Sequence, residues 1–161
     1  MQPTDRDGDH ANDLVLVREI AAPRTALYRC WTEPALMTQW FTPAPWETTH
    51  AETDVRPGGA SLVVMRGPAG EEMPNRGVYL EVVPNERLVF TDAYVRAWEP
   101  SEKPFMTVIL TFEEVGPERT RYTARVRHWT TGDRDAHEAM GFHEGWGKAT
   151  GQLAELAARL P

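Results

Sequence analysis

The chain has 161 residues, of which 41% are hydrophobic and 25% are charged, and its formal net charge is −7. This size and composition are typical of one soluble globular domain. The acidic charge argues against nucleic acid and anionic membrane surfaces as partners, because neither attracts an acidic protein that lacks a strong basic patch. No stretch approaches the roughly 18 consecutive apolar residues of a membrane span, so we expect no membrane insertion.

The first thirteen residues, MQPTDRDGDHAND, are polar and contain no apolar run, so they do not resemble a secretory signal. We expect residues 1–13 to form a mobile tail, residues 14–161 to form a single domain, and the protein to be cytoplasmic. The one cysteine, Cys30, cannot form an internal disulfide. Because Cys30 lies beside Trp31 in an apolar segment, we predict a buried structural residue rather than a nucleophile.

The first half of the chain predicts a strand followed by two short helices. LVLVREI, residues 14–20, has the composition of a strand. Pro23 opens a helix over residues 23–33 in which apolar residues recur at helical spacing. A second helix begins at Pro34 and ends before Pro43.

From residue 48 the hydrophobic period changes to two, which is typical of strands. The turn segments PGG, GPAGEE, PNE, EPSEKP and VGPER are short and favour antiparallel pairing in a meander. The predicted strands cover residues 49–57, 60–67, 76–83, 87–95, 105–114 and 121–129.

The final segment predicts one long helix from about Asp133 to Leu160, with Asp133 or Asp135 as its N-cap. Its apolar residues step by three or four and form a stripe that would cover one face of the sheet. The stripe consists of Ala139, Phe142, Trp146, Ala149, Leu153, Leu156 and Leu160. The element order therefore indicates an α+β fold.

Glycines stand at positions 141, 145, 147 and 151 of this helix, although each costs about 1 kcal/mol relative to alanine. They either let the helix backbone approach the sheet closely or border a cavity. Six tryptophans lie near the ends of predicted elements, where the mouth of a cavity would be. Small-molecule sites are usually apolar pockets with few polar groups, so we predict a ligand cavity beneath the first half of the helix.

Strand alternation predicts which side chains face that cavity. In RYTARVRHW the inward residues are Tyr122, Ala124, Val126 and His128, and the arginines at 121, 125 and 127 lie on the opposite, solvated face. The same logic turns further residues of the neighbouring strands toward the core: Met106, Val108, Leu110, Phe112, Leu88, Phe90 and Tyr94.

The alternation of residues 87–95 also turns Asp92 inward, and burying its carboxylate without a partner is energetically costly. A bulge in the strand could instead expose Asp92. If His128 shares the cavity with Asp92 or Tyr94, these side chains could orient a ligand or act as acid and base. They are weak catalytic candidates, because a hydrogen-bonded core histidine is the simpler interpretation of His128.

Metal and cofactor signatures are missing from the sequence. The pair His137 and Glu138 lacks the second histidine of a zinc protease motif, because position 141 is glycine. His137 and His143 are six residues apart and would point to opposed sides of a helix. No phosphate-binding loop, dinucleotide fingerprint or GxSxG motif occurs, so we expect neither a metal nor a cofactor.

Three stretches of the sequence carry a family resemblance: APRTALYRCWTEPALMTQWFTP, DVRPGGASLVVMRGPAGEEMPNRGVYLEVVPNERLVF and GWGKATGQLAEL. From about Leu14 to Leu160 the chain resembles the bacterial relatives of the heat-shock ATPase activators (AHA-type), within the START-like (SRPBCC) superfamily. Most matched positions look fold-defining. They are Trp31, Thr32, Pro34, Trp40, Phe41, Arg56, Pro57, Gly58, Gly59, Gly77, Glu81, Gly145 and Trp146.

The resemblance implies a helix-grip fold, in which a curved antiparallel sheet of about seven strands surrounds a long C-terminal helix, with two short helices after the first strand. It also implies a hydrophobic cavity between sheet and helix. The superfamily mostly binds lipids, polyketides, hormones and other apolar molecules, and some members are cyclases or dehydratases. The chaperone-stimulating members carry an additional N-terminal domain, for which this chain has no room.

We therefore expect the protein to bind a small hydrophobic or aromatic molecule. The alternatives are a polyketide cyclase- or dehydratase-like enzyme that uses the same cavity, and a chaperone-interacting protein. Exposed strand edges also favour a homodimer. The predicted ligand-binding residues are Trp31, Trp40, Phe41, Tyr94, Trp98, Met106, Val108, His128, Phe142 and Trp146.

Overall fold

The computed structural model describes residues 10–161, so residues 1–9 of the expected tail lie outside the described residues. The four helices are α1 (Arg24–Thr32), α2 (Pro34–Trp40), α3 (Thr131–Ala139) and α4 (Phe142–Arg159). The strands are β1 (Asp13–Ile20), β2 (Glu47–Thr53), β3 (Ala60–Arg66), β4 (Glu72–Val83), β5 (Arg87–Thr91), β6 (Tyr94–Arg96), β7 (Glu99–Pro100), β8 (Met106–Gly116) and β9 (Arg119–His128).

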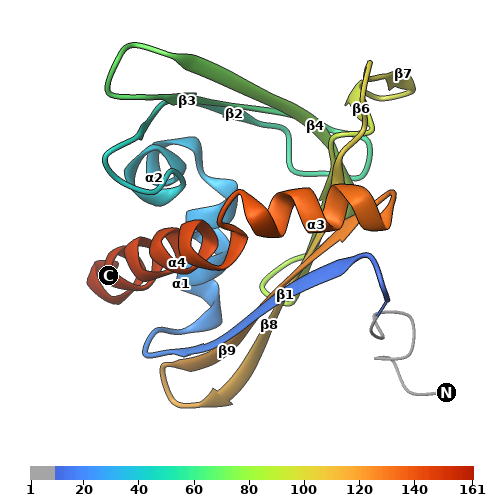
Figure 1. Cartoon of the computed structure of the whole chain (residues 1–161). Coiled ribbons are helices and arrows are strands. Elements are labelled where there is room, and N and C mark those ends of the chain that lie inside the picture. The colour runs from blue at the N-terminus through green and yellow to red at the C-terminus, as the bar shows by residue number, and fades with distance from the viewer. Residues whose placement is uncertain (1–9) are drawn as a thin grey trace, which may run out of the picture.

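Seven strands form one antiparallel sheet in the order β1-β9-β8-β5-β4-β3-β2, and β6 and β7 form a separate hairpin. The sheet curves around α1, α2 and α4, while α3 lies between the end of β9 and the start of α4 (Figure 1). This arrangement confirms the predicted α+β helix-grip fold, with two short helices after the first strand. Within residues 10–161 no helix combines the length and the apolar character needed to span a bilayer.

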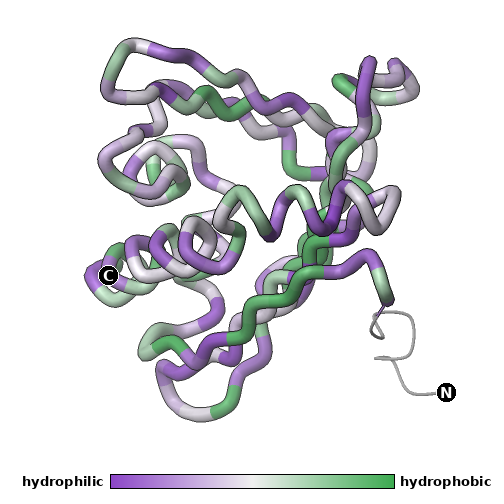
Figure 2. Tube along the Cα trace, in the orientation of Figure 1, coloured by the Kyte–Doolittle hydropathy of each residue, from purple (hydrophilic) through white to green (hydrophobic). Residues whose placement is uncertain are grey.

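The inner, concave face of the sheet carries the residues that alternation predicted for β9. Tyr122, Ala124, Val126 and His128 are all buried. Their partners across the β1–β9 pair include Leu16, which lies opposite Ala124. Apolar stretches of the chain run through β1 and the middle of the sheet, so the hydrophobic core lies between this face and the helices (Figure 2).

The prediction for β8 and β5 is confirmed over most of its length. Val108, Leu110, Phe112 and Leu88 are buried in the core, and Phe90 and Met106 are partly buried against it. The predicted strand over 87–95 is interrupted, however, because β5 ends at Thr91 and β6 begins at Tyr94. Asp92 lies in this break, where its carboxylate accepts hydrogen bonds from the backbone N–H groups of Phe105 (2.8 Å) and Met106 (3.1 Å).

On the outer face, two of the three β9 arginines are less solvated than expected. The carboxylate of Asp13 in β1 accepts hydrogen bonds from Arg125 (3.2 Å) and Arg127 (2.9 Å), and its side chain is only 3% exposed. Burial raises the pKa of Asp13, but the two guanidinium groups outweigh burial and hold this pKa below its ordinary value. Only Arg121, which pairs with Glu113, matches the expected surface role.

The predicted single C-terminal helix is instead two helices. Gly141 has a φ of 96°, a left-handed conformation that ends the helical path between α3 and α4. The first helix also begins slightly earlier than predicted. Its N-cap is Thr130, whose hydroxyl accepts a hydrogen bond from the backbone N–H of Asp133, so neither Asp133 nor Asp135 is the cap.

The other three glycines of the last helix do not bring its backbone tightly against the sheet. A Cβ added to Gly145 or Gly151 would meet no atom within 4 Å, and one added to Gly147 would lie 3.5 Å from the side chain of Arg18. In contrast, a Cβ on Gly77 in β4 would lie 2.4 Å from the carbonyl oxygen of Thr91. Close approach therefore explains Gly77 rather than the glycines of α4.

We predict opposite effects for alanine at two of these positions. Gly77→Ala should lower the free energy of unfolding by about 1–3 kcal/mol, because the added methyl group overlaps backbone that cannot move away without distorting the β4–β5 pair. Gly151→Ala should raise it by up to about 1 kcal/mol, because alanine favours the helix and meets open space. Urea denaturation measures both, and destabilisation by Gly151→Ala would contradict this account of α4.

Candidate functional site

Several predicted ligand-binding residues form an aromatic cluster in the core rather than an open wall. The ring of Trp31 lies 4.8 Å from that of Trp40 and 5.7 Å from that of Phe41. The indole N–H of Trp40 donates a hydrogen bond to the carbonyl oxygen of Cys30 at 2.9 Å. Burial raises the pKa of the Cys30 thiol to about 11, so this residue is a buried, unreactive thiol, as predicted.

A second group of predicted residues lies at the end of the sheet where β8 begins and β9 ends. Met106 is the cross-strand partner of His128. Phe142 is buried at the start of α4, and its ring stacks on that of Trp146 at 5.4 Å. Val108 lies on the same inner face, two residues after Met106 along β8. These residues share the interior between sheet and α4.

Tyr94 and Trp98 lie elsewhere. Both belong to the segment that forms the β6–β7 hairpin, where their rings are 5.9 Å apart and Trp98 is 84% exposed. The structure therefore separates these two residues from the others that were predicted to bind a ligand.

The inner face holds a polar group that the strand pattern of β1 did not reveal. Arg18 lies directly across from Tyr122 in the β1–β9 pair and donates a hydrogen bond to the carbonyl oxygen of Gly147 in α4 at 3.1 Å. The charge of Arg18 acts on the phenol of Tyr122, and so does the indole N–H of Trp31. We call Arg18, Tyr122 and Trp31 the donor cluster.

The donor cluster carries the positive charge of Arg18 and two neutral side chains, Tyr122 and Trp31. Burial raises the pKa of Tyr122, and the indole of Trp31 and the charge of Arg18 offset only part of that effect, so the phenol stays protonated. The indole nitrogen of Trp31 is buried and makes no hydrogen bond of normal geometry within residues 10–161. In the same part of the chain, no carboxylate lies within ion-pair distance of Arg18.

A histidine pair lies at the other end of the inner face of β9. Nδ1 of His128 is 2.8 Å from the carbonyl oxygen of Asn12, and Nε2 of His128 is 2.8 Å from Nδ1 of His137 in α3. Because a carbonyl oxygen only accepts, Nδ1 of His128 must donate. In the neutral pair Nε2 of His128 then accepts from Nδ1–H of His137, which leaves Nε2 of His137 as an acceptor.

This pairing replaces the predicted contact of His128 with Asp92 or Tyr94. Both ring nitrogens of His128 are occupied by Asn12 and His137, and the carboxylate of Asp92 binds backbone N–H groups. Burial and the neighbouring His128 lower the pKa of His137 to about 4, so this ring is neutral near pH 7. No group of three or more metal-ligating side chains occurs within residues 10–161.

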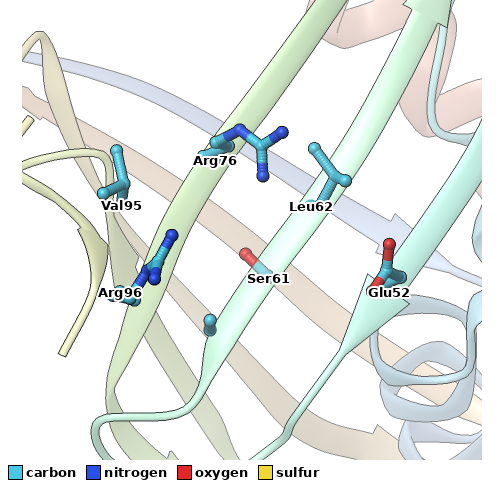
Figure 3. Close-up of a pocket in the computed structure, with 7 residues that line it drawn as sticks. Glu52, Ser61, Leu62, Arg76, Val95 and Arg96 are labelled. Atoms are coloured by element: carbon cyan, nitrogen blue, oxygen red, sulfur yellow. The ribbon is translucent and has the colours of Figure 1, made fainter.

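A groove of about 450 Å³ lies on the outer face of the sheet, away from α4. Figure 3 shows its side chains projecting from β2, β3, β4 and the β6 segment. The mixture of charged and small apolar groups differs from the apolar cavity that the sequence predicted. The lining residues are Glu52, Ala60, Ser61, Leu62, Arg76, Val95 and Arg96.

The histidine pair predicts a specific dependence of stability on pH. The folded chain favours neutral His137, because its pKa falls from an ordinary value of 6.5 to about 4, so the unfolded chain binds more protons between these values. The free energy of unfolding should therefore be retained above pH 6.5 and should fall as the pH decreases toward 4. We expect a loss of about 2 kcal/mol from this group, after allowing for partial exposure.

His137→Asn tests this assignment, because asparagine can still donate to His128 but does not titrate. The variant should show a flatter decrease of stability between pH 6.5 and 4 than the unmodified chain, measured by urea denaturation. His143→Asn is the matched control, since His143 is exposed and pairs with Glu138 at the surface. Equal slopes for the His137→Asn variant and the unmodified chain would contradict the assignment.

The chain is similar to several solved structures over almost its whole length. A protein from Nitrosomonas europaea has a TM-score of 0.90 and 42% identity, covering 94% of this chain and 97% of that one. A protein from Rhodobacter sphaeroides has a TM-score of 0.82 and 25% identity, covering 96% and 97%. An AHSA1-like protein from Aeromonas hydrophila, at 17% identity, shares the fold with a TM-score of 0.68 over 90% and 92% of the two chains.

No curated protein sequence matches the chain. Residues 21–158 match the family described as Activator of Hsp90 ATPase homolog 1-like protein. This match begins just before α1 and extends to the last turn of α4, so it includes both short helices, β2 to β9 and α4. The chain therefore belongs to the Activator of Hsp90 ATPase homolog 1-like family.

Proposed function

We propose that this protein binds a small apolar or aromatic molecule between the inner face of the sheet and α4. The observation that carries the proposal is the donor cluster. Arg18, Tyr122 and Trp31 place polar groups in a largely apolar interior, where Arg18 donates to the carbonyl oxygen of Gly147 and the buried indole of Trp31 makes no hydrogen bond of normal geometry within residues 10–161. Buried polar groups are normally hydrogen-bonded, so donors left without acceptors indicate a missing partner.

The surroundings of the donor cluster support a small apolar partner. Along β9 the next inward residues are Ala124 and Val126, and Leu16 lies across from Ala124 on β1. Alanine is the smallest side chain of this row, and the facing part of α4 carries Gly147. Trp146 beside it is only partly buried against the core. The side chains around the donor cluster are thus apolar, and they include Phe112, whose ring lies 5.9 Å from that of Tyr122.

The histidine pair favours a second candidate, a cyclase- or dehydratase-like enzyme in the same interior. Nε2 of His137 is an acceptor with no hydrogen-bond partner in the described part of the chain, and it lies beside Phe142, whose ring is 5.2 Å away. Such a nitrogen can accept a proton from a bound molecule. Turnover by the His137→Asn variant distinguishes the two candidates. An enzyme should lose its turnover in this variant, whereas binding of the ligand should stay intact for both candidates.

Binding of the neutral apolar probe N-phenyl-1-naphthylamine tests the proposal. The probe should bind the unmodified protein with micromolar affinity and increase in fluorescence. Trp146→Ala should weaken binding about tenfold, because it removes the partly buried indole that covers this part of the interior. Circular dichroism should show the same fold for the variant.

Trp129→Ala is the matched control, because Trp129 is 48% exposed and is not part of the core. It should leave the affinity for the probe unchanged. The proposal fails if the probe does not bind at about 100 µM, or if Trp98→Ala on the exposed hairpin abolishes binding while Trp146→Ala does not.

A further inference from the structure

We infer that the natural ligand is an apolar carboxylic acid whose carboxylate binds Arg18, with Tyr122 and Trp31 as additional donors. This inference rests on the proposed function and specifies the chemical class of the ligand and the residue that selects it.

The three side chains of the donor cluster lie together, because the indole of Trp31 and the charge of Arg18 both act on the phenol of Tyr122. A guanidinium has five N–H donors and no acceptor, an indole has one N–H, and a phenol can donate its O–H. The described residues supply one acceptor to Arg18, the carbonyl oxygen of Gly147 at 3.1 Å, and the buried indole of Trp31 acts on the phenol of Tyr122 without a hydrogen bond of normal geometry. A carboxylate has two oxygens that accept about four hydrogen bonds, including a bidentate pair from arginine, so it complements this arrangement.

The charge of Arg18 distinguishes a carboxylate from a neutral hydrogen-bond acceptor. Arginine stays protonated in proteins, and a partly buried cation without a counter-ion is unfavourable. The neighbouring carboxylate on β1 belongs to Glu19, which alternation places on the outer face, where it pairs with Arg119 and Arg121. A neutral alcohol or ketone would satisfy hydrogen bonds but would leave the charge of Arg18 unbalanced.

The rest of the ligand must be apolar. From Tyr122 the inner row of β9 continues through Ala124 and Val126 to His128, and the residues across from the middle two are Leu16 and Leu14. An apolar ligand with its carboxylate at Arg18 would contact alanine, valine and leucine side chains, and it would have to displace part of the present packing, because Ala124, Val126 and Leu14 are at most 2% exposed.

A matched pair of ligands tests the inference by isothermal titration calorimetry at neutral pH. Decanoate and 1-decanol have the same chain and differ in the charged group. The unmodified protein should bind decanoate about 30-fold more tightly than 1-decanol. Arg18→Met should weaken decanoate binding by about 30-fold and change 1-decanol binding little, because it removes the charge but retains an apolar side chain of similar length.

Arg121→Met is the control variant, since Arg121 lies on the outer face of the neighbouring strand and pairs with Glu113. It should leave the affinities for both ligands unchanged. Tyr122→Phe provides a second test if Arg18→Met does not fold. It removes only a buried hydroxyl and should weaken decanoate binding several-fold, with a smaller effect on 1-decanol.

The outcomes separate this inference from the proposed function. Equal affinities of the unmodified protein for decanoate and 1-decanol would overturn the carboxylate and leave binding of an apolar molecule standing. Tight binding of decanoate that neither Arg18→Met nor Tyr122→Phe weakens would overturn the assigned site. If neither ligand binds, the carboxylate inference is wrong. The naphthylamine probe then shows whether the proposed function fails with it.

Discussion

The packing of α4 against the concave face of the sheet is the interaction on which the rest of the structure depends. Strand alternation gives this face one set of side chains, and α4 covers it with Phe142, Leu153 and Leu156. Any polar side chain on the inner row therefore becomes part of the interior. Arg18 is such a side chain, and its hydrogen bond to Gly147 joins the inner face of β1 to α4. The candidate site is thus a consequence of which face of β1 the helix covers.

Much of the fold could be predicted from the sequence because its patterns are regular. The arginines of β9 alternate with Tyr122, Ala124, Val126 and His128, so the residues of that strand that face inward could be predicted. Proline at the start of α1 and α2 and short turns between strands likewise specified two helices and an antiparallel sheet. The break between α3 and α4 could not be predicted from the sequence, because a single glycine inside a helical pattern is usually tolerated. Only the positive φ of Gly141 distinguishes a break from an unstrained helix position.

The candidate site was less predictable, for two physical reasons. In LVLVREI both alternation phases contain apolar residues and one charge, so the pattern does not say whether Arg18 or Glu19 faces inward. Pairing with β9 decides this, and pairing is a long-range property. His128 was predicted to face inward, but its partner His137 comes from α3, and its other contact is the backbone of Asn12. Tertiary contacts of this kind leave no periodic signal in the sequence.

The most direct test of the central claim follows the six indole N–H resonances of the ¹⁵N-labelled protein while decanoate is added. The signal of Trp31, assigned from the spectrum of Trp31→Phe, should shift strongly because its buried N–H gains an acceptor, whereas the exposed Trp98 and Trp129 should be unaffected. An unchanged Trp31 signal at saturating decanoate, or a response confined to Trp98, would contradict a binding site between the sheet and α4.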